Sequence, residues 1–133
     1  MRMIRSGVIV ILCLTTLAVG AATGPYDQPE RMELKRADLS GAPGMEVITS
    51  ISEYRKGQSV PRHSHHGIET GYVLQGSMVQ FQGKEPTMME TGTPIMNLRD
   101  VPHSGFTVVG DTPLKLFTVH IVDRGKPLYE WVK

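Results

Sequence analysis

Hydrophobic residues along the chain occur in short runs that alternate with polar residues and end near glycine or proline. The clearest runs are MEVITSISEY (45–54), ETGYVLQ (69–75), SMVQFQ (77–82) and LKLFTVHIV (114–122), and the shorter ones are PTMME, TPIMN and GFTVV. Period-two alternation with many β-branched residues is typical of strands, and no window of a dozen residues keeps a helical stripe. The pattern predicts an all-β sandwich or barrel.

The run 114–122 is hydrophobic on both sides. One face carries Phe117, Val119 and Ile121. The other face carries Leu116, Thr118, His120 and Val122. Such a strand is expected between two sheets or at a dimer interface. The residues that follow, DRGKPLYEWVK, are interpreted as a terminal strand or arm whose aromatic residues pack on the barrel. An arm exchanged between two subunits is the alternative.

The first 22 residues have the three parts of a secretory signal peptide. These parts are the basic residues Arg2 and Arg5, an apolar run at 8–19, and small residues ending at Ala21 and Ala22. The apolar run is shorter than the roughly 20 residues that span a bilayer. We expect cleavage after Ala21 or Ala22, no stable membrane span afterwards, and a periplasmic or secreted protein. An uncleaved N-terminal anchor is the alternative.

The rest of the chain is predicted to consist of an extended leader at residues 23–31 and a single domain at residues 32–133. The 133-residue chain has a formal net charge of +1, and removal of residues 1–22 leaves 12 Lys and Arg against 13 Asp and Glu. This balance gives no electrostatic reason to expect nucleic acid as a partner. Because the only cysteine is Cys13, a metal bound by the domain would need His, carboxylate or Met ligands.

Three of the five histidines fall within the stretch RHSHHGIE. His63 and His65 are two residues apart, so on a strand both side chains point to one face, whereas His66 is out of phase. Gly67 offers a turn, and we expect an antiparallel hairpin to bring Glu69 back beside the two histidines. Two histidines and one carboxylate suit Fe(II), Mn(II), Ni(II) or Zn(II). The candidates for a fourth ligand are His103 and His120.

The spacing of these residues resembles the first motif of the cupin family. That motif is met at every position by Gly57, His63, His65, Glu69 and Gly76. At the spacing of the second cupin motif the chain has Gly92, Leu98, Asp100, His103 and Thr107, of which only the glycine and the histidine are kept. The resemblance covers about residues 45–122.

The resemblance implies a double-stranded β-helix, or jelly-roll barrel, as in small single-domain cupins. It also implies that His63, His65, Glu69 and His103 bind a divalent metal. Asp100 stands where the motif has glycine, and aspartate tolerates the left-handed backbone of such a turn better than most residues. Small cupins are often dimers, so a homodimer is a possible assembly.

Cupins similar to this chain include dioxygenases, isomerases, epimerases and lyases, and the fold does not choose among them. We rank metal-dependent, dioxygenase-like oxidation of a small molecule first, because the ligand set suits Fe or Mn. Sugar isomerisation or lyase chemistry comes next. The non-catalytic alternatives are a domain that captures a sugar or an acid and a metal that only stabilises the barrel. The sequence assigns no catalytic residue.

Several other residues have a structural and a functional interpretation. His120 is either a hydrogen-bonded residue of the sheet or an acid–base group beside the metal, and His66 is expected in the solvent-facing loop. Arg62 and Arg99 are either solvated rim residues or contacts for an anionic substrate. Tyr72 is expected to pack rather than to donate a proton. Four methionines are expected as core residues rather than copper ligands; these are Met78, Met88, Met89 and Met96.

Overall fold

The computed structural model describes residues 30–132, which form eleven strands and no helix. The predicted signal peptide (1–22) and the leader up to residue 29 lie outside the described residues. The first strand begins at Arg31. In the described part of the chain, no helix is long and apolar enough to cross a membrane.

Five strands form the larger antiparallel sheet, in the order β1-β2-β10-β5-β8. Their bounds are β1 (Arg31–Asp38), β2 (Met45–Tyr54), β10 (Leu114–Asp123), β5 (Gly67–Gln75) and β8 (Pro94–Asn97). The two longest strands, β2 and β10, are neighbours and pair without interruption along their whole length. They form the centre of this sheet, although some sixty residues separate them in the sequence.

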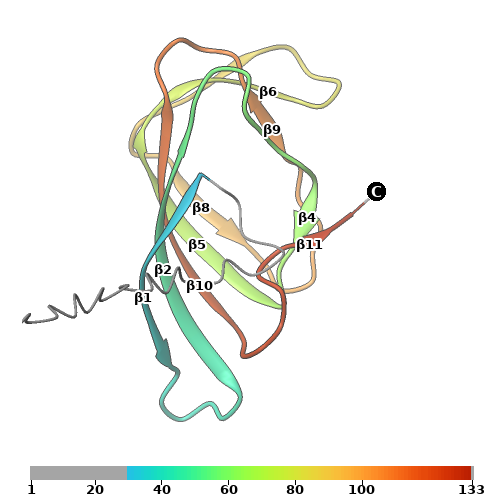
Figure 1. Cartoon of the computed structure of the whole chain (residues 1–133). Helices are drawn as coiled ribbons and strands as arrows, with labels where there is room; N and C mark the ends of the chain where they lie inside the picture. Colours follow the sequence, from blue (N-terminus) through green and yellow to red (C-terminus); the bar gives the residue numbers. More distant parts are fainter. Residues whose placement is uncertain (1–29, 133) are drawn as a thin grey trace, which may run out of the picture.

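A smaller sheet faces the first one and has the order β3-β9-β6-β7. Its strands are β3 (Ser59–Val60), β9 (Phe106–Val108), β6 (Ser77–Phe81) and β7 (Thr87–Met89). A separate pair joins β4 (His63–Ser64) to β11 (Glu130–Trp131). Figure 1 shows these strands around a common interior, with β2, β10 and β5 on one side and β9, β4 and β11 on the other. The predicted all-β, double-stranded β-helix is confirmed.

The alternation of residue types on β2 and β10 decides which face lines the interior. On both strands every second residue is buried and the residues between are partly exposed. The buried side of β10 carries Thr118 and His120, and the partly exposed side carries Phe117, Val119 and Ile121. From the sequence, this second face was expected either between two sheets or at a dimer interface. The structure places it on the outside of the barrel rather than between the sheets.

The interior holds two hydrophobic clusters with polar residues between them. The larger cluster consists of Tyr54, Val60, Val73, Val79, Val108, Leu114 and Leu116. The smaller cluster consists of Ile48, Val122, Leu128 and Tyr129. Fully buried His65 and His120 lie between the sheets as well. A polar layer in an apolar core costs free energy unless its groups are paired, so this layer marks the candidate site.

The predicted hairpin between the histidines and Glu69 is wrong. Strand β4 pairs with β11, and β5 pairs with β10 and β8. The chain instead turns a corner at His66 and passes from one wall of the barrel to the other. Gly67 begins β5 so close to β10 that a Cβ atom there would collide with the carbonyl oxygen of Ile121. Glycine permits this close approach of the two strands because it has no side chain.

Candidate metal centre

The structure brings together the four residues that the sequence singled out as metal ligands. His63 lies on β4, His65 follows it, Glu69 lies on β5, and His103 lies in the loop between β8 and β9. One potential ligand atom from each lies within 4.8 Å of the others. His63 Nε2 is 3.0 Å from His103 Nε2, and His65 Nε2 is 3.2 Å from Glu69 Oε2. The cluster is compatible with a divalent metal ion.

Backbone contacts position the loop that carries His103. His103 N donates to His63 O at 2.9 Å, and His63 N donates to His103 O at 3.3 Å. A second contact joins Asp100 N to His65 O at 2.9 Å. Asp100 has a φ of 57°, the left-handed conformation that glycine adopts most easily. Aspartate therefore keeps the turn that the cupin motif makes with glycine.

The outer nitrogen of each imidazole contacts a backbone carbonyl group. His65 Nδ1 donates to Leu128 O at 2.6 Å, and His63 Nδ1 donates to Pro61 O at 2.8 Å. The corresponding contact of His103 Nδ1 with its own loop is longer, 3.4 Å. Because a carbonyl oxygen only accepts hydrogen bonds, the Nδ1 atoms carry the ring protons. The Nε2 atoms then keep lone pairs that point into the cluster, which is the arrangement of metal-binding histidines.

Lone pairs and a carboxylate that converge in a buried space repel one another unless a cation or additional protons lie between them. Burial lowers the pKa of His63 to about 4 and also lowers the pKa of His103, so additional protons are disfavoured on these rings. Burial acts to raise the pKa of Glu69, but the neighbouring His120 and His65 side chains outweigh it and hold that pKa well below its usual range. Neutral imidazoles around an ionised carboxylate fit a divalent cation.

Two neighbours of Glu69 lie in the same row across the sheet. Cross-strand pairing places His120 of β10 opposite Glu69 on one side and Asn97 of β8 opposite it on the other. Asn97 Nδ2 donates to Glu69 Oε2 at 2.6 Å. His120 Nε2 lies 3.4 Å from Glu69 Oε1, and neither ring nitrogen of His120 has a well-aligned hydrogen-bond partner among the described residues. His120 thus faces the interior, outside the four-residue cluster.

Sequence reasoning missed Asn97. The signal was present in TPIMN, because Asn97 is in phase with Ile95 on a short strand and so shares its inward face. A polar side chain on the inward face of a strand needs a partner, and here the partner is Glu69.

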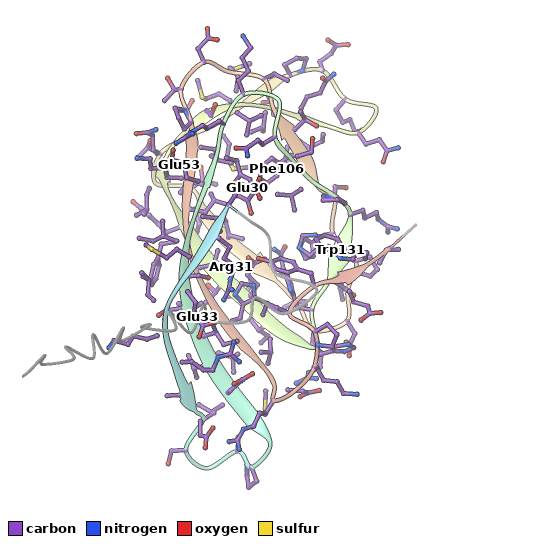
Figure 2. The ribbon with its side chains drawn as sticks, in the orientation of Figure 1. Glu30, Arg31, Glu33, Glu53, Phe106 and Trp131 are labelled. Carbon is purple, nitrogen blue, oxygen red and sulfur yellow. The ribbon has the colours of Figure 1, made fainter. Side chains whose placement is uncertain are left out.

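The C-terminal segment covers the cluster on one side. Buried Tyr129 packs against His63 and His65, with ring centroids 5.1 and 5.4 Å apart. Trp131 stacks on Tyr129 at 5.4 Å and has its backbone paired with His63. Figure 2 shows Trp131 on the side of the barrel away from Arg31 of β1. The expected packing of these aromatic residues on the barrel is confirmed.

The remaining candidate residues lie elsewhere. His66 is outside the cluster, between Asp100 at 3.3 Å and Glu130 at 3.4 Å. Arg99 forms a two-point ion pair with Asp123, and Tyr72 is 49% exposed on the outer face of β5 rather than packed in the interior.

A cavity of about 180 Å³, partly open to the surface, adjoins the cluster. His63, Glu69 and His103 line one end of it, and the walls come mainly from the larger hydrophobic cluster and the side chains packed on it. Met89 contributes to these walls, as expected for a core methionine. The same expectation is wrong for Met88 and Met96, which are 48% and 62% exposed. The cavity gives a small molecule room beside His63, Glu69 and His103.

Comparison with known proteins agrees with this geometry. Residues 50–120 match the family model described as Cupin domain. The chain therefore belongs to the cupin family. Among curated proteins, none matches the chain.

Solved structures with similar folds share few residues with this chain. An uncharacterised protein with a double-stranded β-helix domain from Klebsiella pneumoniae is 12% identical, with a TM-score of 0.56, over 80% of this chain and 89% of that one. The polyketide cyclase RemF from Streptomyces resistomycificus is 21% identical (TM-score 0.51, 70% and 75% covered). A DMSP lyase structure is 16% identical (TM-score 0.51, 65% of this chain), and this chain spans 44% of its length. At these identities the likeness shows the fold alone.

Proposed function

We propose that this cupin is an exported, metal-dependent enzyme with dioxygenase-like chemistry toward a small molecule. The observation that carries the proposal is the cluster of His63, His65, Glu69 and His103 at the end of a cavity. Three imidazoles and one carboxylate would hold Fe or Mn and leave coordination positions open, where the metal supplies Lewis-acid or redox chemistry.

The chain's own residues have three roles in this proposal. The Nε2 atoms of the three histidines and the Glu69 carboxylate hold the metal. Asn97 fixes the orientation of that carboxylate by a hydrogen bond from β8, and His120 lies beside it on β10. The apolar walls of the cavity exclude water and position the substrate against the cluster.

A non-catalytic binding domain is the second candidate. One observation favours it: Glu69 is the only carboxylate among the described residues that line the cavity. The hydroxyl of Tyr54, which also lines it, has its pKa raised by burial to about 12 and so holds its proton at neutral pH. Apart from the imidazoles of the cluster itself, the cavity offers no group that titrates near neutrality and could serve as an acid–base catalyst.

Oxygen consumption separates the two candidates. The protein is loaded in turn with Fe(II), Mn(II) and Zn(II) and incubated with a panel of phenols, enolisable carbonyl compounds and thiols. The enzyme proposal predicts O2 uptake with Fe or Mn for at least one compound, none with Zn, and none in the His65→Ala variant. Binding of a compound by the Fe and Mn forms without O2 uptake or product would contradict the dioxygenase proposal and support the binding domain.

We also propose that the chain is exported, because residues 1–22 have the organisation of a signal peptide. Expression of the full chain in a Gram-negative host, followed by fractionation and N-terminal sequencing, tests this. The expected product is periplasmic or secreted and begins at Ala22 or Thr23. An intact N-terminus on membrane-bound protein would support the anchor instead.

A further inference from the structure

The cavity beside the cluster has no cationic side chain in its walls. Among the described residues that line it, none is Lys or Arg. Arg62 lines a neighbouring surface groove that shares Phe81 and Phe106 with the cavity but is not among the cavity's own lining residues, and Arg99 is paired with Asp123. A phosphorylated or multiply anionic ligand would therefore lose its hydration without gaining a counter-charge other than the metal.

Several polar atoms in the walls already have partners within the protein. Thr118 Oγ1 lies 3.0 Å from Ser50 Oγ in a buried hydrogen bond, and Asn97 donates to Glu69. A sugar has a hydroxyl group on nearly every carbon, and most of these groups would be left unpaired in such a cavity.

Part of the cavity wall is formed by aromatic side chains. Tyr54 and Phe106 meet edge to face with ring centroids 5.6 Å apart, and Phe81 meets Phe106 at 6.4 Å. Figure 2 labels Phe106, which comes from β9, in the wall that faces the larger sheet. Edge-to-face groups of this kind favour an apolar or aromatic body between them.

The cavity volume limits the size of that body. An engineered apolar cavity of about 150 Å³ in another protein holds one benzene molecule. The cavity here, about 180 Å³, therefore has room within its walls for one six-membered ring and a few further atoms, and a second fused ring would extend beyond them.

We propose that the site binds a compact, uncharged molecule with an apolar body the size of one ring and a single oxygen-bearing end. The oxygen-bearing end faces His63, Glu69 and His103, and the body lies between Phe106 and Ile95. This substrate class rests on the proposed metal site, since the oxygen atoms need the metal as their partner. It disfavours sugars and phosphorylated compounds as substrates.

Four hydroxamates with one metal-binding head group and different bodies test the proposal. Acetohydroxamate has a methyl group, benzohydroxamate one ring, 2-naphthohydroxamate two fused rings, and gluconohydroxamate a polyol. Each is titrated calorimetrically into the Zn-loaded protein. Benzohydroxamate is expected to bind at least about tenfold more tightly than acetohydroxamate, or about 1.4 kcal/mol, and the other two no more tightly than acetohydroxamate.

Equal affinities for benzohydroxamate and acetohydroxamate, or tightest binding of gluconohydroxamate, would overturn the substrate class and leave the metal site standing. No binding of any hydroxamate by a protein that retains its zinc would overturn the accessible metal site and the substrate class together. The two failures are therefore distinguishable.

Enlarging the cavity gives a second test. Phe106→Ala and Ile95→Ala each remove wall atoms, and each is expected to improve the affinity of 2-naphthohydroxamate relative to benzohydroxamate at least about fivefold. Phe117→Ala makes the same truncation on the outer face of the sheet and should leave that ratio unchanged. An unchanged ratio in both cavity variants, measured on zinc-retaining protein, would overturn the proposal.

Discussion

Glu69 has a neighbour on each side in the sheet. Asn97 on β8 binds one of its carboxylate oxygens, and His120 on β10 faces the other. Because cross-strand partners are held by the backbone ladder, the orientation of this carboxylate is set before any ligand binds. Residues that do not themselves bind the metal should therefore affect metal affinity.

Asn97→Ala is expected to weaken metal binding about 10- to 100-fold, because Glu69 Oε2 loses the donor that fixes its orientation. Competition between the protein and a chelator of known affinity measures this change. Gln80→Ala is the control, since Gln80 lies on the exposed side of β6 and donates only to Lys84 O. An Asn97→Ala variant with wild-type affinity would contradict the role assigned to Asn97.

The metal-free protein should lose stability as the pH falls from about 6.5 towards 4. Burial lowers the pKa of His63 from 6.5 to about 4, so between these values the unfolded chain binds a proton that the folded chain does not. The free energy of unfolding therefore has its full value above pH 6.5 and decreases as the pH falls below 6.5. The decrease is as much as about 3 kcal/mol for His63 alone. Urea unfolding in the presence of a chelator, measured at several pH values, checks this prediction.

In the same experiment His63→Gln should show a shallower loss of stability between pH 6.5 and 4, because the titrating group is gone. His103 also has its pKa lowered by burial and should contribute in the same direction. A free energy of unfolding that is constant across this range would contradict the assignment of neutral, desolvated imidazoles.

Several residues of the site could be predicted from the sequence, and others could not. The spacing of His63, His65 and Glu69 indicated a common site, and aspartate at position 100 was expected to tolerate a turn that favours glycine, as its φ of 57° confirms. Asn97 was missed because a lone polar residue on a short strand identifies no partner. The partner becomes evident only when β8 is placed beside β5.

At the scale of the elements, the corner between β4 and β5 decides how the site forms. The sequence correctly indicated strands at 45–54, 69–75, 77–82 and 114–122, but its hairpin was wrong because β4 pairs with the distant β11. A local turn signal such as Gly67 shows where the chain changes direction. It does not show which strand pairs with which, because that depends on contacts between residues far apart in the sequence.

Gly67→Ala should destabilise the protein by about 2–4 kcal/mol, because a Cβ atom there collides with the backbone of β10 and displaces β5. Gly83→Ala is the matched control. Gly83, unlike Gly67, has a positive φ, but its Cβ would meet nothing within 4 Å, so only the cost of the left-handed backbone, about 1 kcal/mol, is expected. Denaturant unfolding ranks the two variants, and the reverse order would contradict the close-approach argument.

At the scale of the whole molecule, the fold places a polar site between two apolar clusters. The larger cluster supplies the cavity walls, and the smaller one, with Leu128 and Tyr129, closes the site from the C-terminal side. The barrel class could be predicted from strand periodicity and from the resemblance to cupins. The pairing of β10 with both β2 and β5 could not, because it joins segments far apart in the sequence.

The central claim is that His63, His65, Glu69 and His103 bind one divalent metal. Elemental analysis of the purified, metal-reconstituted protein and its variants tests it most directly. The account predicts about one metal ion per chain in wild type and in His66→Ala, whose ring lies outside the cluster, and loss of most of the metal in His63→Ala and Glu69→Ala. Full metal content in both His63→Ala and Glu69→Ala, or no metal in reconstituted wild type, would contradict it.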